Sequence, residues 1–115
     1  MTELWQKTAR EMVDLLAKGE IRPKEAIAAA AERIAATNGA VNAMVTLCLE
    51  RAYAAAARIE TEGHPEQPGP GYLYGLPVSI KDLHHVEGVL CTQGSPIYAD
   101  HISVESDLEV RTLEA

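Results

Sequence analysis

Long hydrophobic runs are missing from this sequence, and so is any cluster of positive charge. No apolar stretch approaches the roughly 20 residues that a membrane-spanning helix needs, so we expect no membrane partner. The first residues also lack the basic start and continuous apolar centre of a secretory signal. Together these absences predict a cytoplasmic protein.

Basic residues are few: ten Lys and Arg stand against 17 Asp and Glu, which gives a net charge of −7. Phosphate backbones are bound by clustered Lys and Arg, so we expect no direct binding of nucleic acid. Cysteine is also scarce, because only Cys48 and Cys91 are present and they do not form a CxxC pair. This spacing, without a secretory signal, favours reduced thiols in the cytoplasm.

The first half of the 115 residues predicts helices. Apolar side chains at helical spacing, from Trp5 to Leu16, predict a helix over residues 3–18 that Gly19 ends in a left-handed conformation. We interpret Trp5 as a core or docking anchor. A second helix is expected to begin at Pro23, where the missing N–H costs nothing.

Later boundaries are predicted from glycine, proline and asparagine. The second helix is expected to end at Asn38-Gly39, with a short strand or extended linker over 41–47 and a third helix over 49–60. Residues 62–71, which contain three prolines and three glycines, predict a surface loop.

Beyond this loop the pattern changes. The β-branched residues 76–80 predict a short buried strand, and residues 83–103 predict mostly loop. A final helix over 106–115 is expected, with Asp107 or Ser106 as its cap. We therefore divide the chain into a helical region, 1–60, and the start of an α/β domain, 61–115.

Lys81 stands directly after the predicted strand. Side chains alternate along a strand, so Ser79 and Lys81 would share one face. A partly desolvated lysine can act as a base near neutral pH, and a neighbouring hydroxyl can be its proton donor. Chemistry alone leaves a solvated surface lysine as the alternative interpretation.

Three ordered motifs strengthen the interest in Lys81. They are YGLPVSIKD at residues 74–82, VEG at 86–88 and CTQGS at 91–95. Their order and spacing resemble the amidase signature family, which shows G-x-P-x-x-x-K-D, then V-x-G, then T-x-G-S. The flanking helical segments are also similar to the N-terminal region of that family, so the resemblance covers nearly the whole chain.

The resemblance implies an α/β fold: an N-terminal helical region and the first, incomplete part of an α/β/α sandwich around a mixed sheet. It implies hydrolysis of small-molecule amides through a Ser–cis-Ser–Lys triad, with Lys81 as the catalytic lysine and no cofactor. It also implies a homodimer for the parent enzyme, with a complementary C-terminal chain as a further partner.

Neither triad serine is expected among these residues, because nothing in 1–115 resembles the family's glycine- and serine-rich segment. Ser79 and Ser95 do not fill the gap, since Ser79 occupies a variable position and Ser95 belongs to the T-x-G-S turn. We therefore expect the 115 residues to be an inactive N-terminal fragment. The alternatives are a fragment similar to the catalytic component of a tRNA-dependent amidotransferase, or a truncated, non-catalytic dimerisation protein.

Supporting roles can be predicted around Lys81. Asp82 is expected to orient Lys81 or to bind a backbone N–H. Gly94 is expected to permit a strained turn, with Thr92 and Ser95 forming hydrogen bonds that hold the lysine loop.

The histidine pair His84-His85 raises the question of a metal site, with Asp82, Cys91 or His101 as further ligands. Neighbouring side chains of an extended segment point to opposite sides, and the family needs no metal. We therefore expect no metal site, although one of these histidines could line the substrate entrance.

Overall fold

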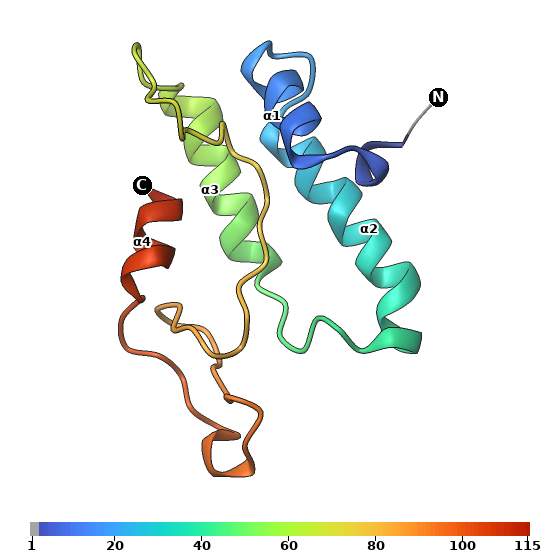
Figure 1. Ribbon diagram of the computed structural model, residues 1–115, viewed down its shortest axis with the longest axis vertical. Coiled ribbons are helices and arrows are strands. Elements are labelled where there is room, and N and C mark those ends of the chain that lie inside the picture. Colours follow the sequence, from blue (N-terminus) through green and yellow to red (C-terminus); the bar gives the residue numbers. More distant parts are fainter. Residues whose placement is uncertain (1–2) are drawn as a thin grey trace. The chain divides into compact units, whose positions relative to one another are not determined.

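The computed structural model describes residues 3–115 (Figure 1). The chain divides into two compact units, Met1–Pro77 and Val78–Ala115. The described part of the first unit contains the 3₁₀ turn η1 (Leu4–Gln6) and the helices α1 (Ala9–Ala17), α2 (Pro23–Val41) and α3 (Leu49–Glu62). The second unit contains the 3₁₀ turn η2 (Pro96–Tyr98) and the helix α4 (Leu108–Glu114).

Helix α1 begins later than predicted because Thr8 is its N-cap residue. The Thr8 Oγ1 accepts a hydrogen bond from the backbone N–H of Glu11, and the Glu11 carboxylate accepts one from the Thr8 N–H at 2.7 Å. This capping box separates α1 from the short turn that holds Trp5. Gly19 ends the helix at φ 71°, as the sequence predicts.

Helix α2 begins at Pro23 as predicted but continues through Gly39 to Val41. The prediction that Asn38-Gly39 ends it was wrong, because Asn42 adopts the left-handed conformation that closes the helix. The Asn38 side chain instead forms two 2.9 Å hydrogen bonds with the backbone of Met44. Asn38 therefore fixes the path of the chain after the helix.

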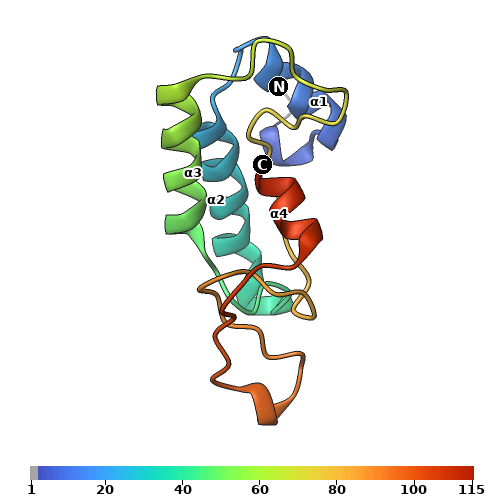
Figure 2. The ribbon, with the colours of Figure 1, turned by 90° about the vertical axis from the view of Figure 1, so that its left-hand side faces the viewer.

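The alanine-rich helices α2 and α3 pack against each other (Figure 2). Ala26 and Ile27 of α2 and Ala56 of α3 are buried, and small side chains let two helices approach closely. In α1, Met12 and Leu16 are also buried. The apolar stripe of this helix therefore belongs to the core of the first unit.

Trp5 is a docking anchor within the first unit. Its side chain is 42% exposed, and the guanidinium carbon of Arg33 lies 4.0 Å from the ring centroid. This cation–π contact joins η1 to α2, which also pack together.

The loop after α3 returns to the start of α2 through Gly75. A Cβ atom added to Gly75 would lie 2.7 Å from Cγ of Pro23, and Gly75 has φ 85°. Both the space and the backbone conformation therefore require glycine at this position.

The predicted strand and mixed sheet were wrong for the residues described. Residues 3–115 contain no strand, and a single antiparallel bridge joins Leu90 to Ile102. The β-branched residues 76–80 favour an extended backbone, but a strand also needs a neighbouring segment with which to form a hydrogen-bonded ladder. No described segment pairs with them in this way. These 113 positions therefore form helices joined by long irregular segments, in place of the expected α/β arrangement.

Two irregular arms of the second unit, residues 85–91 and 101–107, are joined by backbone hydrogen bonds and by side chains. The His85 N–H donates to the Asp107 carboxylate at 2.8 Å, and the Asp107 N–H donates to the His85 carbonyl at 3.0 Å. Ser106 accepts a 2.9 Å hydrogen bond from the Glu87 N–H. Asp107 is the N-cap residue of α4, but its side chain makes no capping hydrogen bond. The carboxylate accepts the hydrogen bond from the His85 N–H instead.

No helix among residues 3–115 is both long enough and apolar enough to cross a membrane.

Candidate functional site

Lys81 lies on an exposed turn at the start of the second unit. The carbonyl oxygen of Lys81 accepts a hydrogen bond from the N–H of His84 at 3.0 Å, which closes the turn. Partial burial after a strand was expected, whereas the Lys81 side chain is open to solvent in this chain. The ammonium group can therefore be reached by a partner from outside the turn.

Asp82 fastens this turn to the motif at residues 91–95. One carboxylate oxygen accepts the Thr92 N–H at 2.8 Å, and the other accepts the Thr92 hydroxyl. These bonds, the hydroxyl first and the backbone N–H second, hold the pKa of Asp82 below its usual value. Of the two predicted uses of Asp82, the structure shows the bond to a backbone N–H.

The segment after Thr92 turns sharply. Gln93 and Gly94 have φ values of 51° and 66°, and the Ser95 N–H donates to the Thr92 carbonyl at 2.9 Å. Two successive positive φ values are typical of a type I′ turn, so the prediction for Gly94 is confirmed. The Ser95 hydroxyl accepts the Ile97 N–H at the start of η2 and does not hold the lysine loop.

The two neighbouring histidines have different partners, as expected of adjacent side chains. His85 Nδ1 lies 2.8 Å from the hydroxyl of the buried Ser103, and the His85 ring contacts His101 edge-on. Cys91, in the same unit, is also buried, and burial raises the pKa of its thiol.

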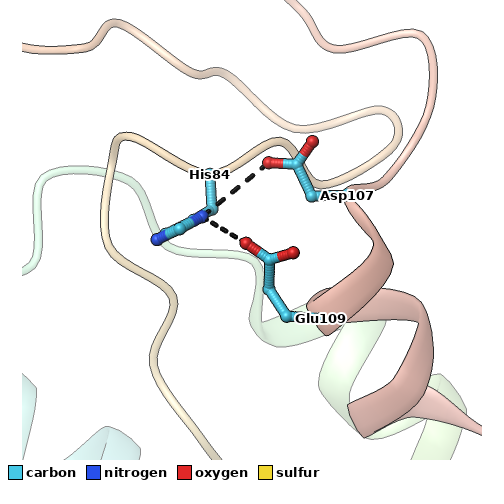
Figure 3. A group of neighbouring side chains, drawn as sticks. All are labelled: His84, Asp107 and Glu109. Atoms are coloured by element: carbon cyan, nitrogen blue, oxygen red, sulfur yellow. Dashed lines mark ion pairs between the residues drawn. The ribbon is translucent and has the colours of Figure 1, made fainter.

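His84 is close to two carboxylates at the start of α4 (Figure 3). Its Nδ1 lies 2.5 Å from Glu109 Oε1 and 3.8 Å from Asp107 Oδ2. This group was not predicted: the further ligands considered beside His84-His85 were Asp82, Cys91 and His101, and no metal site was expected. Asp107 and Glu109 are separated by one residue in the sequence, and this was the only local pattern that could have pointed to the group. Such acidic pairs are common at exposed helix starts.

The comparisons with known proteins identify the class. The family model described as Amidase matches residues 25–115, which include Lys81 and Thr92. The chain is similar to the glutamyl-tRNA(Gln) amidotransferase A subunit of Moorella thermoacetica, with 37% identity over 113 residues that cover 97% of the chain and 23% of the relative. The protein of the same name from Salinispora tropica is 35% identical, over all of the chain and 23% of the relative.

A third relative of that name, from Oleidesulfovibrio alaskensis, is 34% identical over 89% of the chain and 20% of the relative. The chain belongs to the amidase signature family, as its motifs predict. It spans about a fifth of the length of the curated relatives that it matches, between 20% and 23% for these three.

Proposed function

We propose that this chain is the N-terminal part of an enzyme that cleaves carboxamide C–N bonds, with Lys81 as the catalytic base. The observation that supports this most is the place of Lys81 inside the segment that matches the family. The lysine stands on a turn whose next residue, Asp82, is fixed by two hydrogen bonds to Thr92. A base needs such a fixed backbone so that its amine stays within reach of a proton donor.

The proposed chemistry is acyl transfer through a serine nucleophile. In the proposed step the Lys81 amine accepts a proton from a bridging serine, which takes the proton of the nucleophilic serine. The serine oxygen bonds to the amide carbonyl carbon, and the C–N bond breaks as the leaving nitrogen receives the proton. Water then hydrolyses the acyl-enzyme and restores the serine.

Both serines belong to a glycine- and serine-rich segment that no part of residues 1–115 resembles. We therefore propose that these residues alone do not hydrolyse amides, and that Lys81 acts once that segment is supplied. Lys81 is exposed in the described residues, so we propose that the supplied segment also provides the partial desolvation that a basic lysine needs.

The test is substitution of Lys81 in the full-length enzyme. We expect Lys81→Ala to lower kcat/KM by about 10²- to 10⁴-fold, the usual contribution of a general base, without changing the circular dichroism spectrum. Lys81→Arg should be equally impaired because arginine keeps the charge but does not release its proton. Lys24→Ala, at an exposed lysine of α2, is the matched control and should remain active. Near-normal turnover of Lys81→Ala would remove Lys81 from the mechanism.

A second version of the function is favoured by the names of the relatives. All three are components of a glutamyl-tRNA(Gln) amidotransferase, so the released ammonia would be passed to a charged tRNA with the help of partner proteins. The net charge of −7 on these residues disfavours contact with the tRNA, so we expect other parts of the assembly to make that contact. If the full-length protein releases ammonia from simple amides without any partner, the hydrolase version is supported. If release depends on a second protein, the amidotransferase version is supported.

A further inference from the structure

A cluster of His84, Asp107 and Glu109 lies on the second unit outside the contacts between Asp82 and Thr92 (Figure 3). One ligand atom from each of the three residues lies within 4.8 Å of the others. We propose that this cluster binds a divalent transition-metal cation, of which Zn²⁺ is the representative. The proposal does not depend on the role of Lys81.

The distances between the ligand atoms suit such an ion. A zinc ion binds imidazole nitrogen and carboxylate oxygen at about 2.0–2.2 Å, so two of its tetrahedral ligands stand roughly 3.4 Å apart. The two distances from His84 Nδ1, 2.5 Å to Glu109 and 3.8 Å to Asp107, lie on either side of that value. The His84 and Glu109 side chains are 44% and 53% exposed, so small rotations of both can open the site.

Two of the ligands are attached to fixed backbone. The oxygen of Asp107 that faces His84 also accepts the His85 N–H at 2.8 Å, and a carboxylate oxygen keeps a further lone pair for a metal. On the other side, the turn closed by the 3.0 Å bond from His84 N–H to Lys81 carbonyl sets the position of His84. A hydrogen bond to a ligating carboxylate, such as the one from His85 to Asp107, orients the ligand and raises the affinity of a site.

The donor set selects the class of ion. Magnesium and calcium prefer sites made of oxygen alone, whereas imidazole with carboxylate suits zinc and its neighbours in the first transition row. Two carboxylates bring two negative charges to one imidazole, so a divalent cation neutralises the cluster while water completes the coordination. A bound ion would join the turn after Lys81 to the start of α4.

The experiment is titration of the tag-free, metal-free full chain with ZnCl₂ by isothermal calorimetry. We expect one zinc ion per chain, and about tenfold or greater weakening in His84→Ala and in Glu109→Gln. The matched controls are His64→Ala, which removes a histidine from the first unit, and Glu105→Gln, which neutralises an exposed carboxylate near α4. Both controls should bind zinc as the original chain does.

X-ray absorption at the zinc edge gives an independent readout. Nitrogen and oxygen ligands at about 2.0–2.2 Å, without sulfur at about 2.3 Å, are the expected result. Sulfur scattering would assign the ion to a cysteine, and equal binding by both cluster variants would assign it elsewhere. Either result, or the absence of saturable binding, would mean that the cluster is an ion pair only and would overturn the proposal.

Discussion

At the scale of single residues, the region around Lys81 is held by side chains that bind backbone groups. Asp82, the residue after Lys81, accepts hydrogen bonds from both the backbone N–H and the hydroxyl of Thr92. We regard Asp82 as a positioning residue, because its hydrogen bonds to Thr92 fix the turn on which Lys81 stands. The predicted role of Thr92 in holding the lysine loop agrees with this geometry.

The hydrogen bonds of Asp82 predict a dependence of stability on pH. Because they hold its pKa below the usual carboxyl value in the folded chain, the ionised form stabilises the fold. The stabilisation by Asp82 is complete above the pKa that Asp82 has in the unfolded chain. It is lost as the pH falls through the lowered pKa that Asp82 has in the folded chain. We expect Asp82→Asn to reduce the free energy of unfolding at pH 7 and to have a smaller effect in acid.

Denaturant unfolding at a series of pH values, from neutral to strongly acidic, would measure this difference. Glu11 and Glu25 also have lowered pKa values, chiefly through backbone N–H donors, so the whole chain loses stability in acid for several reasons. The difference between Asp82→Asn and the original chain isolates the contribution of Asp82. If the difference in unfolding free energy between Asp82→Asn and the original chain stays constant with pH, the contacts with Thr92 do not depend on ionisation of Asp82.

At the scale of elements, the helices were predictable because their signals are local. Pro23 starts α2, Gly19 ends α1, and residues 49–62 repeat apolar side chains at helical spacing. The backbone over 76–80 could not be predicted in this way, since a strand is completed by a distant segment of the chain. Asn38 shows the limit of residue preferences, because it continues the helix and bonds to the chain beyond it.

The contact between Gly75 and Pro23 predicts a cost for any side chain at Gly75. We expect Gly75→Ala to lower the free energy of unfolding by about 1–3 kcal/mol, since its methyl group would overlap the proline ring and its φ is positive. Gly71→Ala is the matched control, because nothing lies within 4 Å of an added Cβ there and no positive φ is required. Thermal unfolding of both variants measures the effect, and equal melting temperatures would contradict it.

At the scale of the whole chain, the two cysteines lie in different units and differ in burial. Cys48 is exposed in the first unit, whereas Cys91 is buried in the second, and both are free thiols. Burial is the first cause of the raised pKa of Cys91, and the charge of Asp82 is the second. Cys91 is therefore protected both by lack of access and by a low thiolate fraction.

This difference predicts two rates of thiol modification. With an aromatic disulfide reagent in mildly alkaline buffer, we expect one thiol per chain to react rapidly and the second only as the second unit opens. Cys48→Ser should remove the rapid phase, and denaturant should expose both thiols of the original chain. Two rapid thiols in the folded chain would show that Cys91 is not protected.

The candidate site was partly predictable at this scale as well. The ordered motifs are short, local patterns, so they led to the family, which the comparisons confirm, and to Lys81, whose role stays a prediction. The grouping of His84 with Asp107 and Glu109 follows from the way two distant arms of the second unit meet, which no local pattern records.

The hydrogen bonds that join those arms also constrain how the sequence can evolve. In a sheet, backbone groups bind each other, so many side chains can be exchanged without losing the pairing. Here the arms share a few backbone bonds, and the side chains of Asp107 and Ser106 add links to the backbone N–H groups of His85 and Glu87. Substitution of Asp107 or Ser106 removes a link that no backbone group replaces, so we expect these two positions to have little freedom to drift even where they take no part in catalysis.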